Sequence, residues 1–197
     1  MRFLPVGVDA LLVECEDPPA LFEAALELRA GFTDAVPAAA TVLFLGVDDV
    51  AALESSLSAL RPGRSLRADR TVVEVPTVYD GADISSVAQL WEMTEREVVA
   101  THTSVEFTVA FCGFAPGFAY CTGLPAARSV PRLDSPRSKV PAGSVGLAGE
   151  YTGVYPSASP GGWRLLGHTE LTLWDVSRTD PAVLSPGTRV RFVEVAR

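Results

Sequence analysis

The stretch that decides the fold of the C-terminal half begins with FCGFAPGFAYCTGLP at residues 111–125 and ends with SPGGWRLLGHTELTLWD at residues 159–175. Glycine and proline recur along it every few residues. Glycine allows positive φ and close backbone approach, whereas proline fixes φ and removes a hydrogen-bond donor. Such a density of both residues predicts short strands joined by shaped loops, because a plain core does not need the chain path to be specified at so many positions.

Short apolar runs lie within and around this stretch, with Gly or Pro at the turns between them. They span residues 107–111, 144–148, 162–166, 171–174 and 189–195. Many short strands punctuated in this way are typical of a compact β-barrel with long loops. We therefore predict a β-barrel domain over residues 105–197.

The segment before the barrel, residues 77–104, reads as a helical linker. Ser85 or Ser86 is placed to cap a first short helix, and Thr94 with Glu97 matches the capping box that starts a second one. The second helix is expected to end near His102.

Residues 1–76 alternate strand-like and helical patterns. Strands are expected at 10–15, 41–45 and 70–75. One helix begins at Asp17, and another begins at Asp48 or Asp49. This order favours a small two-layer α+β domain of ferredoxin-like type, which serves as a scaffold because it has no histidine and no catalytic cluster. The predicted fold class is thus α+β, with a ferredoxin-like domain followed by a β-barrel.

Composition limits the partners of the chain. Its 197 residues carry a formal net charge of −8, which argues against nucleic acid or an anionic membrane as the main partner. No apolar run approaches the ~18 residues of a membrane span, and residues 1–5 lack a signal-peptide core. The expected location is the cytoplasm.

Four cations, Arg128, Arg132, Arg137 and Lys139, fall within one proline-interrupted loop. Their clustering in an acidic chain favours a local anion site, although a solvated loop paired with surface acids explains the pattern equally well. Lys139 is the only lysine in the chain, and a compact charge with a tunable pKa suits a catalytic role.

The two histidines, His102 and His168, are the natural general-base candidates, although structural hydrogen bonding is the more common role for either. The turn at 159–162 could hold an oxyanion or a carboxylate with its backbone N–H groups. We expect Arg137, Lys139, His168 and this turn to meet at one pocket mouth. No metal site is expected, because the histidines are far apart and the three cysteines lack metal-ligand spacing.

Four segments in this order resemble one known family: GFAPGFAY (113–120), VPAGSVGLAG (140–149), TGVYP (152–156) and SPGGWRLLGHT (159–169). It is the family of the B subunit of bacterial 5-oxoprolinase, also labelled allophanate hydrolase subunit 1 or KipI-type histidine-kinase inhibitor. The same module forms half of the carboxyltransferase domain (subdomains C and D) in biotin-dependent urea carboxylases. The resemblance implies a ferredoxin-like domain followed by a cyclophilin-like barrel.

The resemblance and the residue reasoning together yield a set of candidate site residues. The catalytic candidates are His102, Lys139 and His168. The candidates for binding a substrate or anion are Arg137, Ser144, Tyr155, Gly161, Gly162 and Trp163. The candidates for an interface or pocket wall are Phe114, Pro116, Phe118 and Tyr120.

The implied function is that of the B subunit of an ATP-dependent 5-oxoprolinase, which opens 5-oxo-L-proline to L-glutamate. The family then implies three further features: partnership with the homologous C subunit and with a third, A subunit; ATP as co-substrate; and an isolated chain that is inactive. Two alternatives stay open. One is a carboxyltransferase half-site served by biotin on a partner, favoured by the form of residues 119–123. The other is an inhibitor of a sensor histidine kinase.

Overall fold

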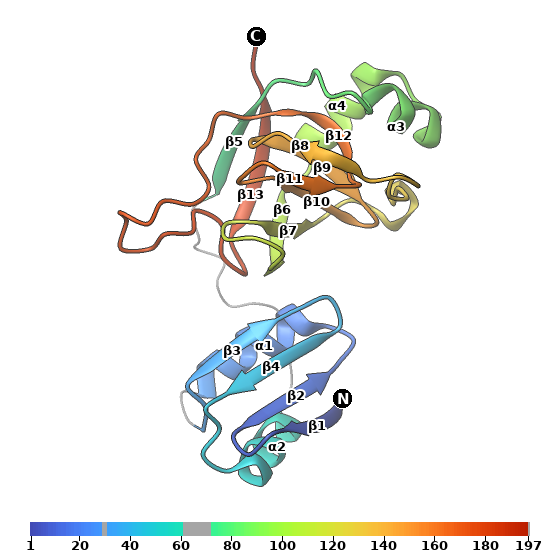
Figure 1. The fold of residues 1–197 in the computed structure, drawn as a ribbon. Coiled ribbons are helices and arrows are strands. Elements are labelled where there is room, and N and C mark those ends of the chain that lie inside the picture. The colour runs from blue at the N-terminus through green and yellow to red at the C-terminus, as the bar shows by residue number, and fades with distance from the viewer. Residues whose placement is uncertain (29–30, 61–71, 197) are drawn as a thin grey trace. The chain divides into compact units, whose positions relative to one another are not determined.

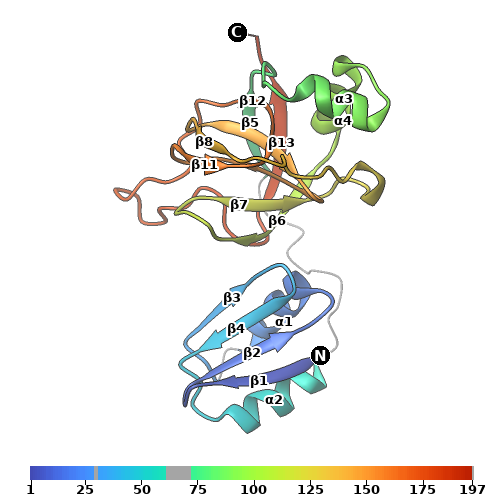
Figure 2. The ribbon, with the colours of Figure 1, turned by 45° about the vertical axis from the view of Figure 1, so that its right-hand side comes forward.

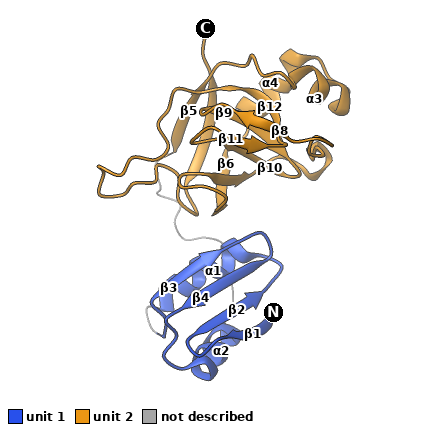
Figure 3. Ribbon diagram, viewed as in Figure 1, with its two compact units in different colours: residues 1–70 blue, residues 71–197 orange. Residues whose placement is uncertain are grey.

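The computed structural model describes residues 1–28, 31–60 and 72–196 (Figure 1). The chain divides into two compact units, Met1–Arg70 and Thr71–Arg197, coloured separately in Figure 3. Each unit has its own hydrophobic core.

Unit 1 is a four-stranded antiparallel sheet with two helices packed on one face (Figure 2). Its elements are β1 (Arg2–Val6), β2 (Ala10–Glu14), α1 (Pro18–Leu28), β3 (Asp34–Pro37), β4 (Thr41–Leu45) and α2 (Val50–Ala59). The predicted starts of both helices are confirmed. The side chains of Asp17 and Asp49 accept hydrogen bonds from the N–H groups of Ala20 and Ala52 and so satisfy donors that the first turn leaves free.

The element order of unit 1 differs from the ferredoxin-like prediction. It is strand, strand, helix, strand, strand, helix, and the sheet order is β1-β2-β4-β3. Sequence reasoning missed β1 and β3, the two edge strands, because each contains a proline, Pro5 and Pro37. Proline weakens a strand pattern but is tolerated at a sheet edge, where its missing N–H faces no neighbour. The ferredoxin-like assignment stays a prediction.

Unit 2 is built on a seven-stranded sheet of order β12-β9-β10-β7-β6-β13-β5, with a separate two-stranded ribbon of β8 and β11. Its strands are β5 (Val73–Thr77), β6 (Phe107–Cys112), β7 (Ala119–Thr122), β8 (Arg137–Val140), β9 (Ser144–Ala148), β10 (Tyr151–Val154), β11 (Ser159–Gly161), β12 (Arg164–His168) and β13 (Arg189–Glu194). Its helices are α3 (Ile84–Trp91) and α4 (Glu95–Ser104), with a 3₁₀ turn at Ala126–Arg128.

The two edges of this sheet approach each other, so the predicted barrel is confirmed as a nearly closed sheet. Val78 and His168 exchange two backbone hydrogen bonds of 2.9 Å. The N–H groups of Gly81 and Asp83 then donate to Leu166 and Leu165 at 3.0 Å. Residues 78–83 therefore run along β12 and form the seam of the barrel.

Two boundaries differ from the sequence-based expectation. The described part of the strand expected at 70–75 in the first domain falls in β5, which pairs in parallel with β13 and belongs to unit 2, whereas residues 70 and 71 lie outside the described residues. The helices of the expected linker also belong to unit 2, because Val87, Trp91 and Val98 pack with Leu147 and Leu166 of the barrel. Residues 171–174, expected as a strand, make only an isolated bridge between Trp174 and Ala182.

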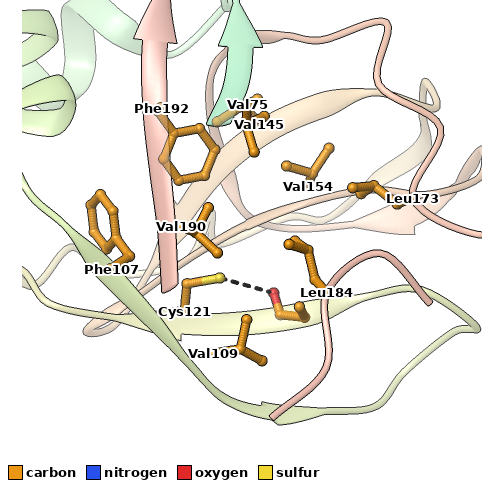
Figure 4. Packing of buried hydrophobic residues seen from close by; sticks show 11 residues of the cluster. Val75, Phe107, Val109, Cys121, Val145, Val154, Leu173, Leu184, Val190 and Phe192 are labelled. Atoms are coloured by element: carbon orange, nitrogen blue, oxygen red, sulfur yellow. Dashed lines mark hydrogen bonds between the residues drawn. The ribbon is translucent and has the colours of Figure 1, made fainter. Parts of the chain in front are cut away.

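The barrel interior is a continuous apolar cluster (Figure 4). Phe107, Val190 and Phe192 meet Val145 and Cys121 there, all within 1% of complete burial. The capping box at Thr94 and Glu97 is confirmed, and it starts α4 on the flank of the barrel. None of the helices in the described parts of the chain is long and apolar enough to cross a membrane.

Candidate functional site: an aromatic pocket on the barrel

A small pocket of about 70 Å³ opens on unit 2. Its lining residues are Phe114, Phe118, Tyr120, Arg132, Tyr155, Pro160, Gly161, Gly162 and Trp163. Phe118 is the centre of the aromatic wall: its ring lies 5.0 Å from Tyr120, 5.3 Å from Tyr155 and 5.2 Å from Trp163 between centroids. The tilted and edge-to-face angles of these pairs are those that aromatic quadrupoles favour.

One wall comes from the loop between β6 and β7. Phe114 has φ +71°, and the N–H of Ala115 donates to the carbonyl of Gly113 at 2.9 Å. This three-residue pattern is a γ-turn with positive φ at its centre, which is rare and strained for a residue other than glycine. The turn leaves the Phe114 side chain 63% exposed beside the pocket. Backbone strain that the surrounding structure maintains is common at functional sites.

A second part of the lining comes from the end of β11 and the turn that leads to β12. A Cβ at Gly161 would lie 2.4 Å from the hydroxyl of Tyr155 and 2.9 Å from its ring. Tyr155 is 1% exposed and cannot move aside easily. Glycine at position 161 is therefore required for the turn to pack against Tyr155 and leave the pocket open.

The ionisable side chains of the pocket are Arg132 and two phenols, Tyr120 and Tyr155. Burial raises the pKa of Tyr120 and of Tyr155, and the nearby positive charge of Arg132 opposes the rise in both. Both phenols are therefore protonated at neutral pH and can donate hydrogen bonds. Arg132 makes no ion pair with any described residue.

The four cations of the 128–139 loop do not form one anion site. Arg137 pairs with Asp83 at 2.8 Å and also donates to the carbonyl of Trp163 at 3.4 Å. Arg128 lies over the ring of Trp91, 5.5 Å from its centroid. Lys139 is exposed on the β8 ribbon. Of the four, only Arg132 lines the pocket.

His102 is a core residue in the structure. It is completely buried, its Nδ1 lies 2.7 Å from the hydroxyl of Tyr79, and its Nε2 lies 2.8 Å from Oγ1 of Thr152. Because Thr152 donates to the carbonyl of Gly146, it accepts from Nε2–H, so Nδ1 accepts from Tyr79. Burial lowers the pKa of His102 to about 3. This histidine is neutral and inaccessible, which corrects the expectation of a catalytic base.

His168 lies at the seam, where its Nδ1 is 2.9 Å from a carboxylate oxygen of Asp80. It does not line the pocket, and neither do Arg137, Lys139 or the buried Ser144. β8, which carries Arg137 and Lys139, pairs with β11 of the 159–162 turn, with Gly161 opposite Arg137. The expected meeting of Arg137, Lys139 and His168 with that turn at one pocket mouth is nevertheless not found, because none of the three lines the pocket. The structure instead brings that turn together with the aromatic residues of the 113–120 segment.

Sequence reasoning left several residues of this region out of the candidate site. The sequence marks Arg132 only as one of four clustered cations, and it marks Pro160 only as part of the 159–162 turn. Asp83 and Tyr79, which hold Arg137 and His102, had no local signal, since their partners are 54 and 23 residues away. No group of three metal-ligating side chains is found within the described residues.

The fold, a nearly closed β-barrel flanked by helices, is that of a carboxyltransferase-type module. Residues 1–184 match the family model for the carboxyltransferase domain, subdomain C and D, and the chain belongs to this family.

A curated relative, the 5-oxoprolinase B subunit of Escherichia coli O157:H7, is 49% identical over 132 residues, which are 66% of this chain and 61% of the relative. The chain spans 55–61% of the length of the three curated B subunits that it matches. The solved structure of TTHA0988 matches this chain with a TM-score of 0.79 at 34% identity. The match covers 95% of this chain and 40% of the TTHA0988 chain. Urea carboxylase of Kluyveromyces lactis has a TM-score of 0.71 at 17% identity, over 98% of this chain and 22% of that one, and shares the fold.

Proposed function

We propose that this chain is the B component of an ATP-dependent 5-oxoprolinase, which converts 5-oxo-L-proline, ATP and water to L-glutamate. The observation that carries the proposal is the identity of 41–49% to three proteins that are named as 5-oxoprolinase B subunits. The small aromatic pocket supports it, because a five-membered lactam with one carboxylate needs little volume, two apolar walls and a cation.

The proposed partners are the homologous C subunit of the enzyme, together with its third, A subunit, in a cytoplasmic complex. The structure of TTHA0988 supports a partner for this chain, because the match covers only 40% of that longer chain and leaves the remainder for a second region. ATP is the co-substrate of the complex. The pocket, at about 70 Å³, is far below the roughly 300–1,000 Å³ of sites for larger ligands, so ATP binds elsewhere in the assembly.

A carboxyltransferase role with biotin on a partner is the second candidate. It is supported by the fold that the chain shares with urea carboxylase at 17% identity, which is a likeness of architecture alone. The assignment to the 5-oxoprolinase B subunits rests on much higher identity and is preferred. Inhibition of a sensor histidine kinase is a third function, which no observation favours.

The experiment is to co-express the chain with the proposed C and A subunits and to measure L-glutamate formation and ATP hydrolysis with 5-oxo-L-proline. Both products should appear together and only when 5-oxo-L-proline is present. A parallel assay supplies urea, bicarbonate and a biotin carboxylase. Carboxylation of urea, with no glutamate in the first assay, would reject the proposed function in favour of the second candidate.

A further inference from the structure

Arg132 differs from the neighbouring Arg137 and Arg164 because no described residue forms an ion pair or a hydrogen bond with its guanidinium. Arg137 is neutralised by Asp83, and Arg164 donates to the carbonyl of Pro131 at 2.9 Å and to the hydroxyl of Ser86 at 3.0 Å. Arg132 has no such hydrogen bond or ion pair among the described residues, yet it lines the pocket. Arg132 is exposed and lines the same pocket as Tyr120 and Tyr155, and its positive charge opposes the rise in pKa of both phenols.

The charged and phenolic groups of the lining are suited to an anion. They are one guanidinium and two protonated hydroxyls, and no carboxylate lines the pocket. Arginine matches a carboxylate with its planar fork of N–H groups, and such charge-assisted hydrogen bonds are the strong ones. The other lining residues are Phe114, Phe118, Pro160, Gly161, Gly162 and Trp163, and none of them has a charged side chain.

Size and shape narrow the ligand further. About 70 Å³ accommodates a carboxylate with part of a small ring, and the open side is bordered by Phe114 on its strained turn. Aromatic walls formed by Phe118, Tyr155 and Trp163 suit the apolar face of such a ring.

We propose that this pocket binds the carboxylate of a small cyclic acid, with Arg132 as the carboxylate partner and Phe118, Tyr155 and Trp163 against the ring. The inference rests on the proposed function for the identity of the acid, 5-oxo-L-proline, and on the lining residues for its chemical class. Arg132, which lay outside the sequence-derived set, becomes the residue that determines specificity for a carboxylate.

The test uses the assembled complex and the KM for 5-oxo-L-proline. Arg132→Gln should raise KM at least ~10-fold with kcat nearly unchanged, because the lost interaction is made in the ground state as well as in the transition state. The KM of Arg132→Lys should lie between that of the wild type and that of Arg132→Gln. The matched control is Arg96→Gln, which removes an exposed arginine of α4 outside the pocket and should leave KM unchanged. Inhibition by 2-pyrrolidinone, the same lactam without the carboxylate, should be equally weak in the wild type and in Arg132→Gln.

The outcomes separate this inference from the proposed function. An unchanged KM in Arg132→Gln overturns the pocket assignment while the 5-oxoprolinase function stands. If the complex does not turn over 5-oxo-L-proline, the proposed function fails. The pocket is then tested on the full isolated chain by NMR titration with 5-oxo-L-proline and cyclopentanecarboxylate. Binding of either acid that Arg132→Gln abolishes supports the pocket; a wild-type chain that binds neither overturns it.

Discussion

His102 shows how a reactive residue type becomes a structural one. Its imidazole joins Tyr79 after β5 to Thr152 on β10, and its ring lies 4.4 Å from that of Phe192 in the barrel core. The two hydrogen bonds require neutral imidazole with its proton on Nε2, so that Nδ1 can accept from the hydroxyl of Tyr79. Protonation of Nδ1 would remove this acceptor and would bury a positive charge in the core. The histidine therefore links the helical flank to the seam only while it is neutral.

This role predicts a pH dependence of stability. The pKa of His102 is lowered from 6.5 to about 3, so below pH 6.5 the unfolded chain binds a proton that the folded chain does not. The contribution of neutral His102 to the free energy of unfolding is fully present above pH 6.5. As the pH drops from 6.5 toward 3, the free energy of unfolding should fall by up to about 1.4 kcal/mol per pH unit. Urea unfolding at pH 7 and pH 5 measures the loss, which should be absent in His102→Gln. NMR signals of the wild-type His102 ring that titrate near pH 6.5 would contradict the assignment.

The seam between residues 78–83 and β12 is the element-scale feature on which the barrel depends. Its backbone hydrogen bonds require two glycines, since a Cβ at Gly167 would lie 2.1 Å from the carbonyl oxygen of Val78 and one at Gly81 would lie 2.3 Å from that of Leu165. The same seam carries Asp83, whose carboxylate accepts from the N–H of Leu165 at 2.7 Å and pairs with Arg137. Arg137 in turn holds the carbonyl of Trp163, so the seam also supports the pocket wall.

Substituting Gly167 by Ala should therefore destabilise unit 2. Backbone atoms on both sides must separate to make room, and we expect a loss of about 2–3 kcal/mol in the free energy of unfolding. The matched control is Gly113→Ala, where a Cβ meets no atom within 4 Å and φ is not positive; its effect should stay within about 0.5 kcal/mol. Equal denaturant midpoints for the two variants would show that the seam does not limit stability.

At the scale of the whole molecule, the pocket lacks the groups that hydrolysis requires. Its titratable residues are Tyr120, Tyr155 and Arg132, and both histidines lie elsewhere. Opening a lactam needs a nucleophile and a base in mutual reach, which this lining does not supply. Phe114, which lines the pocket, is 63% exposed, so apolar surface borders the pocket. Aromatic residues of this kind are enriched at protein interfaces.

If the proposed function holds, the isolated chain should be inactive and should gain activity with the proposed C and A subunits. We expect the rate of 5-oxoproline-dependent ATP hydrolysis to rise at least ~100-fold on adding the partners, because catalytic groups that act as a unit are strongly non-additive. Purified chain alone, partners alone and the mixture are compared at equal concentrations. A chain that reaches the full rate by itself would refute a shared site.

The sequence by itself determined the features that depend on neighbouring residues. Aspartate caps, the Thr94–Glu97 capping box and glycine–proline punctuation act over a few residues, and they predicted the starts of α1, α2 and α4 and the barrel. The expected cap at Ser85 or Ser86 is wrong, because α3 begins at Ile84, after Asp83. The resemblance of the 113–120 and 159–169 segments added most of the pocket wall. These signals depend only on residues that are close in the sequence, so they can be interpreted without knowing how the barrel closes.

Only the tertiary structure decided which polar residues remain available. Asp83 reaches Arg137 across 54 positions and Thr152 reaches His102 across 50, because the seam and the antiparallel strands bring them together. Those pairings engage Arg137 and His102, two of the candidate site residues. Arg132, in contrast, makes no ion pair with a described residue. No local pattern distinguishes Arg132 from Arg137, since the difference between them is the partner that barrel closure supplies.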